Sequence, residues 1–268
     1  MSTTETFQLS VEAAEFYEAR FVPAIFAEWA PLLVDAARIR PGQSILDVAC
    51  GTGVVARTAA DRLTGDATIT GLDLNEGMLA VAERLRPDLD WRVGDVADLP
   101  FPDRTFDAVL CQMALMFFPD RLGAVQEMAR VTRPGGIVAL VVPASIDAQP
   151  AYAPFVDLAA RVAGPAASSL LGTYWACGDL VELHRLMESA ELEVIDTRTY
   201  LGTARFGSPE ELAVTEVEGS PLVERITEEE YRRIRAGARE ALAPWTAPDG
   251  TLHAPLRGHV VAARTRAG

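Results

Sequence analysis

Short apolar runs and helical patterns alternate along the first half of the chain. The apolar runs are the length of buried strands, and the segments between them carry apolar side chains at helical spacing. Strands that alternate with helices are typical of an α/β fold with a parallel sheet. The pattern therefore predicts such a sheet with helices on both faces. The strand-like runs are residues 45–48, 67–72, 89–93 and 105–110, and the helical segments are residues 54–63 and 75–85.

A glycine turn follows the first predicted strand, in the sequence ILDVACGTGVVA of residues 45–56. Gly51 and Gly53 tolerate positive φ and allow a ligand to approach the backbone. Their spacing to Ala56 also fits the dinucleotide fingerprint. Asp47 argues against a dinucleotide, because a carboxylate at the strand's end would repel a pyrophosphate on the helix N-terminus. It suits a ligand that carries an ammonium and a sulfonium group, as S-adenosylmethionine does.

Acidic residues also end the second and third predicted strands. Asp73 lies 20 residues past Gly53, where an acid accepts hydrogen bonds from ribose hydroxyls in both dinucleotide and S-adenosylmethionine sites. Asp95 and Val96 follow the third strand in the loop GDV. One acceptor beside one backbone donor matches the edge of adenine.

These motifs resemble those of class I S-adenosylmethionine-dependent methyltransferases. The wording DVACGTG is closest to the ubiquinone/menaquinone-biosynthesis type, and the resemblance runs from Tyr17 to Val142 through GDVADLPFPDRTFDAVL and PDRLGAVQEMARVTRPGGIVALVV. It implies a Rossmann-like sheet of seven strands in the order 3-2-1-4-5-7-6, with strand 7 antiparallel, helices on both faces and a helical cap. It also implies S-adenosyl-L-methionine as cofactor and S-adenosyl-L-homocysteine as product.

The resemblance assigns cofactor contacts to residues at the C-terminal ends of the strands and in the N-terminal segment. That segment, residues 11–38, carries Tyr17, which matches the tyrosine that the family folds over the methionine part. A core aromatic is an equally good interpretation of Tyr17. The predicted cofactor-binding residues are Tyr17, Asp47, Ala49, Gly51, Gly53, Asp73, Leu74, Met78, Asp95, Val96, Cys111 and Gln112.

We predict a single methyltransferase domain over residues 1–268, with a cofactor-binding core at residues 39–142. Two helical cap insertions are expected at residues 143–178 and 203–252. Strands six and seven are expected at residues 192–199 and 256–265, and Pro134-Gly135-Gly136 is predicted as the turn before the fifth strand.

Composition narrows the possible partners. The net charge of −14 argues against nucleic-acid substrates, which need clustered positive charge. All 24 basic residues are arginine, which excludes Schiff-base chemistry and a P-loop lysine. Three scattered cysteines and three histidines predict no metal site. No apolar run approaches a membrane span, and the start MSTTETFQLS lacks a signal pattern. We therefore expect a cytoplasmic monomer or homodimer.

The sequence indicates less about the molecule that accepts the methyl group. Methyl transfer relies on holding the reactants in line and needs no signature residue. Candidate acceptor-binding residues are Met113, Phe117, Tyr152, Phe155 and Trp245, for which ordinary core packing is the competing interpretation. Of the histidines, His184 is expected on an exposed helix face and His259 in the core. His253 precedes the seventh predicted strand, and we predict that it is a base for the acceptor.

The sequence thus predicts a methyltransferase for a small, largely apolar or aromatic metabolite, with oxygen or carbon as the methylated atom and secondary metabolism as its setting. One alternative binds S-adenosylmethionine and catalyses a rearrangement or cyclisation. A second is an NAD-dependent oxidoreductase, which Asp47 and the GDV loop disfavour. A third is a non-catalytic binding protein with the same fold.

Overall fold

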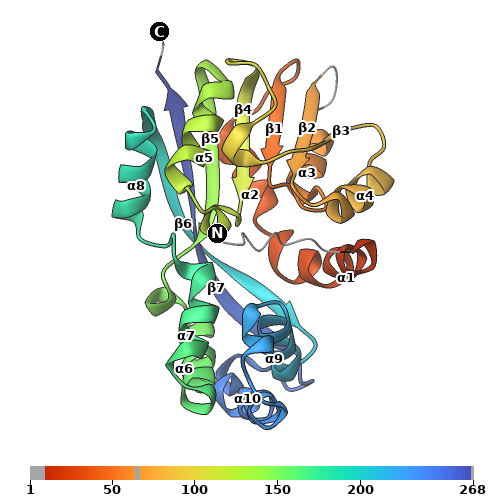
Figure 1. The fold of residues 1–268 in the computed structure, drawn as a ribbon, viewed down its shortest axis with the longest axis vertical. Helices are drawn as coiled ribbons and strands as arrows, with labels where there is room; N and C mark the ends of the chain where they lie inside the picture. Colours follow the sequence, from red (N-terminus) through yellow and green to blue (C-terminus); the bar gives the residue numbers. More distant parts are fainter. Residues whose placement is uncertain (1–9, 64–66, 267–268) are drawn as a thin grey trace, which may run out of the picture. The chain divides into compact units, whose positions relative to one another are not determined.

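The structure is a computed structural model that describes residues 10–63 and 67–266 (Figure 1). Most of the N-terminal stretch used for the expected localisation therefore lies outside the described residues. The strands are β1 (Ser44–Val48), β2 (Thr68–Asp73), β3 (Asp90–Val93), β4 (Phe106–Gln112), β5 (Thr132–Pro143), β6 (Leu192–Phe206) and β7 (Leu252–Thr265). The α-helices are α1 (Val11–Phe21), α2 (Ala30–Ala37), α3 (Val54–Arg62), α4 (Glu76–Leu85), α5 (Arg121–Val131), α6 (Tyr152–Ala163), α7 (Pro165–Gly172), α8 (Leu180–Ser189), α9 (Pro209–Glu218) and α10 (Glu228–Ala241).

The strands form one sheet in the order β3-β2-β1-β4-β5-β7-β6, with β7 antiparallel, as predicted. Strands β1 to β5 pair in parallel, and Asp47 of β1 lies opposite Gly71 of β2 and Leu110 of β4. The C-terminal ends of β1, β2 and β4 therefore meet at one edge of the sheet. In open α/β sheets this edge is where ligands bind.

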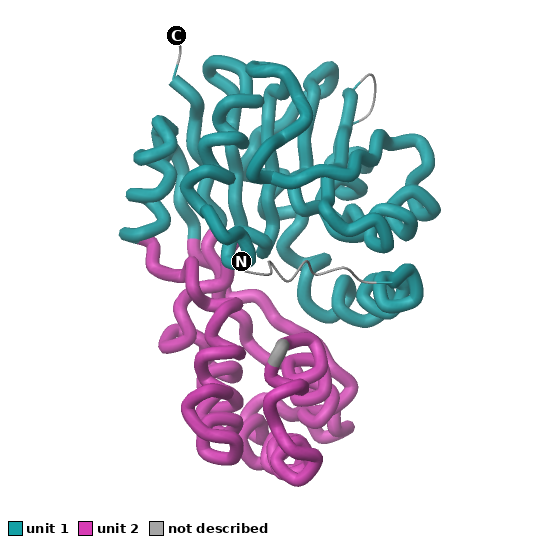
Figure 2. Tube along the Cα trace, in the orientation of Figure 1, with its two compact units in different colours: residues 1–141, 181–198, 260–268 teal, residues 142–180, 199–259 magenta. Residues whose placement is uncertain are grey.

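Two compact units make up the chain, and each is described by itself (Figure 2). Unit 1 comprises residues 1–141, 181–198 and 260–268, and unit 2 comprises residues 142–180 and 199–259.

Unit 1 holds the parallel part of the sheet. Its inner strands β1 and β4 are largely apolar because both faces of the sheet are covered there. In β1, Ile45, Leu46 and Val48 are fully buried. Helix α2 packs against α3 and β4, and α1 packs against α4. The predicted N-terminal helical segment consists of α1, a π-helical turn at Val22–Phe26 that contains Pro23, and α2.

Among the described residues, unit 2 holds the α-helices α6, α7, α9 and α10 and end portions of β5, β6 and β7. Helix α6 packs against α7 and α10, and α10 packs against α9. Phe155 on α6 is fully buried in this core. His259 is buried as expected, with its Nδ1 2.9 Å from the Thr199 hydroxyl and its Nε2 3.2 Å from the Gly178 carbonyl.

Three boundaries differ from the sequence-based prediction. Strand β6 continues to Phe206, and β7 begins at Leu252, so His253 lies inside a strand. Pro134-Gly135-Gly136 belongs to β5, where the pairing with β4 shifts register between Phe106 and Ala108. Glycine and proline mark an irregular strand here as readily as a turn. None of the described helices combines the length and apolar character needed to span a membrane.

Candidate functional site

The glycine turn links β1 to α3 at the C-terminal edge of the sheet. Ala49, Gly51 and Gly53 all have positive φ, at 51°, 54° and 84°. The Asp47 carboxylate reaches across this turn and accepts a hydrogen bond of 2.9 Å from the Ala56 amide in the first turn of α3. The carboxylate thus fixes where the helix begins relative to the strand.

Asp47 is a buried acid with no cation beside it. It is 1% exposed, and none of the described arginines or histidines forms an ion pair with it. Burial raises the pKa of Asp47 to about 8, against the opposing effect of the Ala56 amide, and the charge of Asp73 raises it further. A lone buried carboxylate is costly unless a positive group pairs with it. The site is therefore suited to a cationic ligand.

Asp73, at the end of β2, is tied to the same turn. Its Oδ2 accepts from the Gly51 amide at 2.7 Å, and its Oδ1 accepts from the Asn75 amide at 2.8 Å. Burial raises the pKa of Asp73, whereas these backbone donors lower it. Each carboxylate oxygen keeps accepting capacity after one bond. The two backbone amides therefore fix the orientation of the Asp73 carboxylate, and each of its oxygens can still accept a hydrogen bond from a hydroxyl group.

Helix α1 lies over the glycine turn. A Cβ built on Gly51 would lie 3.9 Å from the Tyr17 ring, and that ring stacks on Phe21 and Phe26 with centroids 5.5 and 5.4 Å apart. Two further contacts hold the helix here, because Glu18 accepts from the Thr52 hydroxyl at 2.5 Å and pairs with Arg57 at 2.8 Å. The sequence pattern did not single out Glu18, since its partners lie far along the chain.

Gln112, the last residue of β4, presents an unsatisfied oxygen. Its Nε2 donates to the Phe26 carbonyl at 3.1 Å, which sets the orientation of the amide. Its Oε1 is buried and accepts no hydrogen bond from any residue that the structure describes. A buried acceptor without a partner costs about 1–3 kcal/mol, so this oxygen is matched to a donor on a ligand. Cys111 beside it is fully buried.

The adenine-side candidates lie along the neighbouring strand ends. The exposed Asp95 accepts from the Ala97 amide at 2.9 Å and so caps the short helix that begins at the buried Val96. Leu74 is 45% exposed, directly after Asp73. Met78 is buried with Ala14 of α1, and Tyr17 packs against them.

The two glycines of the turn serve different purposes, which the sequence pattern did not show. A Cβ on Gly53 would lie 2.3 Å from the Trp91 ring, whereas Gly51 has nothing closer than Tyr17 at 3.9 Å. The space beside Gly53 is thus filled by the protein itself. Close approach of a ligand to the backbone is open only at Gly51.

An S-adenosylmethionine molecule fits these residues. Asp47 offers a buried carboxyl group with no cationic partner among the described residues, Gln112 offers a buried acceptor, and the Asp73 carboxylate faces the same turn. Ammonium, sulfonium and ribose hydroxyl groups are the matching donors and charges. The described residues contain no group of three or more histidine, cysteine, aspartate or glutamate side chains arranged to hold a metal ion.

The predicted acceptor residues belong to different units. In unit 1, Met113 follows β4 with a φ of 50°, and Phe117 is 40% exposed. In unit 2, Tyr152 and Phe155 are buried on α6, and Trp245 is half-buried after α10.

His253 is an exposed residue of β7 in unit 2. Its Nδ1 lies 2.9 Å from Arg205 Nη1, and its Nε2 lies 3.3 Å from the Thr251 hydroxyl. Since arginine can only donate, Nδ1 is an acceptor here. One of these contacts must open before the ring can take a proton from an acceptor, so the predicted role of His253 requires a rearrangement.

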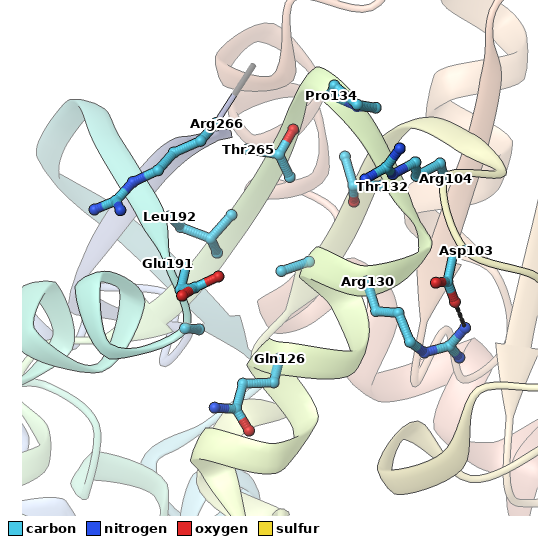
Figure 3. A pocket seen from close by; sticks show the side chains of 12 residues that line it. Asp103, Arg104, Gln126, Arg130, Thr132, Pro134, Glu191, Leu192, Thr265 and Arg266 are labelled. Atoms are coloured by element: carbon cyan, nitrogen blue, oxygen red, sulfur yellow. Dashed lines mark hydrogen bonds and ion pairs between the residues drawn. The ribbon is translucent and has the colours of Figure 1, made fainter. Parts of the chain in front are cut away.

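A cavity of about 370 Å³ lies in unit 1 away from this site (Figure 3). Among its lining residues are Arg104 just before β4, Thr132 at the start of β5 and Thr265 at the end of β7. It therefore sits at the N-terminal ends of the parallel strands, opposite the glycine turn. Arg130 on its wall is paired with Asp103 at 2.8 Å.

Comparisons with known proteins find methyltransferases among the relatives of the chain. Residues 46–140 match the family described as methyltransferase domain. Over 108 residues the chain is 44% identical to the demethylmenaquinone methyltransferase of Renibacterium salmoninarum, covering 40% of this chain and 44% of that protein. Over 247 residues it is 30% identical to the nocamycin O-methyltransferase of Saccharothrix syringae, covering 88% of this chain and 79% of that protein.

The fold has close counterparts as well. The crystal structure of the YcgJ protein of Bacillus subtilis aligns with a TM-score of 0.62 at 20% sequence identity, covering 90% of this chain and 99% of that one. The match to the demethylmenaquinone methyltransferase, in contrast, spans less than half of that enzyme's length.

Fold, site and relatives together define a class I S-adenosylmethionine-dependent methyltransferase, and the chain belongs to that family. The stretch of 108 residues that matches the demethylmenaquinone methyltransferase is the part of the chain that resembles the ubiquinone/menaquinone-biosynthesis type. S-adenosylmethionine is accordingly its cofactor.

Proposed function

We propose that this protein transfers a methyl group from S-adenosylmethionine to an oxygen or carbon atom of a small, largely apolar or aromatic metabolite. The observation that carries the proposal is the buried Asp47 carboxylate, which has no cationic partner among the described residues and lies at the glycine turn. Similarity to an O-methyltransferase over 88% of the chain supports oxygen as the methylated atom. We further propose a role in secondary metabolism and a cytoplasmic location, as a monomer or homodimer without nucleic-acid partners.

The residues around the turn would divide the work of holding the cofactor. Asp47 and Gln112 would bind the positively charged methionine part, Asp73 the ribose, and Asp95 with Val96 the adenine edge. Tyr17 on α1 would cover the methionine part and limit access of water. The cofactor itself supplies an electrophilic methyl group on a good leaving group, so the protein's main task is to align the acceptor with it.

Acceptor binding is proposed for Met113, Phe117, Tyr152, Phe155 and Trp245, with contributions from the two helical insertions at residues 143–178 and 203–252. His253 stays a prediction as the acceptor's base. Its exchange for alanine should lower turnover if the ring takes the acceptor's proton, and should leave cofactor affinity unchanged.

Product analysis tests the reaction. With a panel of hydroxylated aromatic compounds as acceptors, S-adenosylhomocysteine should form in a one-to-one ratio with a methylated product. An S-adenosylmethionine-dependent cyclisation would change the substrate without releasing S-adenosylhomocysteine. Tighter binding of NAD than of S-adenosylhomocysteine in calorimetry would overturn the proposal.

Replacing Asp95 with alanine should weaken S-adenosylhomocysteine binding by about 5- to 150-fold, because a hydrogen bond to a charged group contributes roughly 1–3 kcal/mol. Isothermal titration calorimetry measures this directly. Asp98→Ala is the matched control, since it is an exposed aspartate of the same short helix. Equal affinities of the two variants would remove Asp95 from the adenine site.

Exhaustive chelation should leave methyl transfer unchanged, because the described acids, cysteines and histidines are not grouped as metal ligands. The rate is measured before and after treatment with EDTA. Loss of activity that added magnesium restores would contradict the prediction.

A further inference from the structure

The cavity at the N-terminal ends of the parallel strands has no part in the proposed methyl transfer. All the residues that line it belong to unit 1, and it lies at the edge of the sheet opposite the glycine turn (Figure 3). Pockets for small organic molecules begin at about 300 Å³, so a cavity of about 370 Å³ is large enough for such a ligand.

Two buried threonines give the cavity hydrogen-bond acceptors. The Thr132 hydroxyl donates to the Met128 carbonyl at 2.6 Å, and the Thr265 hydroxyl donates to the Arg133 carbonyl at 2.5 Å. A hydroxyl that has given its hydrogen keeps oxygen lone pairs, so both oxygens can accept from a ligand. The apolar part of the lining consists of Ala129, Pro134, Ala190 and Leu192.

Two exposed charged residues, Arg104 before β4 and Glu191 before β6, lie on opposite sides of the cavity (Figure 3). Neither side chain forms a hydrogen bond or an ion pair with a residue that the structure describes. Helix α8 ends directly before Ala190 and Glu191, and the C-terminal end of a helix carries partial negative charge. One side of the cavity is therefore basic and the other side is acidic.

The other charged groups of the lining are paired or directed elsewhere. Asp103 accepts from Arg130 at 2.8 Å, and carboxylates and backbone carbonyls together use all five N–H donors of Arg130. Figure 3 shows the Arg266 side chain pointing away from the rest of the lining. A ligand in the cavity would therefore meet the charges of Arg104 and Glu191.

The backbone holds both residues in a conformation that side chains rarely adopt. Five described residues other than glycine have a positive φ, and Arg104 and Glu191 are two of them, at 57° and 61°. Such a conformation costs about 1–2 kcal/mol per residue, and strained residues cluster at ligand sites. Two of the other three, Ala49 and Met113, follow β1 and β4 at the edge where we propose that the cofactor binds.

We propose that this cavity binds a small dipolar metabolite, with a carboxylate toward Arg104, a primary ammonium group toward Glu191 and an apolar chain between them. A guanidinium group forms charge-assisted, bidentate hydrogen bonds with a carboxylate. The three donors of an ammonium group match the Glu191 carboxylate and a threonine oxygen. The site is separate from the cofactor-binding edge and does not depend on the proposed function.

The strand order sets the separation of the two charges on the ligand. Strands β5 and β7 lie between β4 and β6, so the starts of β4 and β6 are three inter-strand spacings apart, about 14 Å. The side chains of Arg104 and Glu191 can cover part of this distance from each side. An α-amino acid is therefore too short, and the ligand needs several carbon atoms between its charged groups.

Calorimetry on the full chain tests the proposal with 6-aminohexanoate as the probe, and with hexanoate and hexylammonium as probes that carry one charge each. We expect the wild type to bind 6-aminohexanoate at least 10-fold more tightly than either of the others, because it alone meets both residues. Glu191→Gln should abolish the preference over hexanoate, and Arg104→Gln should abolish the preference over hexylammonium. The double variant Arg104→Glu/Glu191→Arg should restore binding, since the probe can turn round.

Matched controls are Glu188→Gln and Arg185→Gln, which change exposed residues of α8 outside the cavity and should bind 6-aminohexanoate as the wild type does. Urea unfolding of each variant should match the wild type, because the substituted side chains are exposed. Saturating S-adenosylhomocysteine should leave the binding of 6-aminohexanoate unchanged.

Four results would overturn the inference. The first is no binding of 6-aminohexanoate by the wild type, and the second is equally tight binding of a probe with one charge. The third is wild-type affinity in both Arg104→Gln and Glu191→Gln. The fourth is displacement of 6-aminohexanoate by S-adenosylhomocysteine, which would place the probe in the cofactor site.

Discussion

Replacing Asp47 with asparagine should make the cofactor-free protein more stable, and increasingly so as the pH rises from about 4 to about 8. The carboxylate is buried, and its one hydrogen bond, from the Ala56 amide, is one that an asparagine oxygen can also accept. Asparagine carries no charge that must be removed from water. Its stability should therefore lack the pH dependence that Asp47 imposes on the wild type.

The direction follows from the pKa of the two states. In the unfolded chain an aspartate ionises near pH 4, whereas in the folded protein burial raises the pKa of Asp47 to about 8. Between these values the folded state holds a proton that the unfolded state has lost, so the free energy of unfolding falls as the pH rises. The window spans about four pKa units at about 1.4 kcal/mol each, so the effect reaches roughly 5 kcal/mol at its upper end.

The same substitution should weaken cofactor binding by about 10- to 100-fold, because the positively charged methionine part loses its carboxylate partner. Calorimetry with S-adenosylmethionine and S-adenosylhomocysteine separates the two cationic groups. Equal losses for both ligands would assign Asp47 to the ammonium group, and a larger loss for S-adenosylmethionine would assign it to the sulfonium.

Urea unfolding at several pH values gives the stability part of this prediction. Asp98→Asn, the same change at an exposed position, is the control and should follow the wild type at every pH. An Asp47→Asn protein that follows the wild-type pH profile would show that the carboxylate is not desolvated in the folded state. Unchanged cofactor affinity would contradict its proposed role.

The fold was readable from the sequence because its signals are local. Asp47 lies near the end of the first predicted strand, and Asp73 and Asp95 follow the second and third. Their meeting at one sheet edge could therefore be predicted from parallel pairing alone. The glycine turn is similarly self-contained, since positive φ at Gly51 and Gly53 depends on the backbone of the turn itself.

Features that depend on distant residues could not be predicted. Glu216 has the charge of a surface residue, yet it is half-buried on α9 (Pro209–Glu218). His253 was expected in a loop, but β7 extends to Leu252 and places it in a strand beside Arg205 of β6. No pattern along the chain links Glu18 to Thr52 and Arg57, because their contact forms only when α1 lies over the turn.

The contact of Trp91 with Gly53 and Gly71 also could not be predicted from the sequence. It leads us to expect a large loss of stability when Gly53 is replaced. The indole lies on β3, its Nε1 donates to the Arg86 carbonyl at 2.9 Å, and its ring occupies the space beside two glycines. A Cβ on Gly53 would lie 2.3 Å from the ring, and so would a Cβ on Gly71 of β2. The half-buried ring thus lies between the glycine turn and the sheet, and its Nε1 hydrogen bond holds it there.

Gly53→Ala should therefore lower the free energy of unfolding by about 2–5 kcal/mol, the sum of two costs. A side chain at a φ of 84° costs about 1–2 kcal/mol, and overpacking against the Trp91 ring costs about 1–3 kcal/mol. Substitutions at two other glycines measure the backbone cost and the packing cost separately. Gly42 has a φ of 81° with nothing within 4 Å, so Gly42→Ala should show only the backbone cost. Gly71 meets the ring without a positive φ, so Gly71→Ala should show only the packing cost.

A smaller side chain at position 91 should relieve the packing cost and leave the backbone cost in place. Trp91→Leu removes the ring, so the double variant Gly53→Ala/Trp91→Leu should be more stable than the sum of the single changes by about 1–3 kcal/mol. The pair Gly42→Ala and Trp91→Leu should add without coupling, because no atom of the ring is near Gly42. Urea unfolding of the wild type, the single variants and the double variants gives the free energies of unfolding from which the coupling is calculated. If the stability changes of Gly53→Ala and Trp91→Leu were simply additive, the glycine would be required for its backbone conformation alone. Trp91 would then not restrict the size of the side chain at position 53.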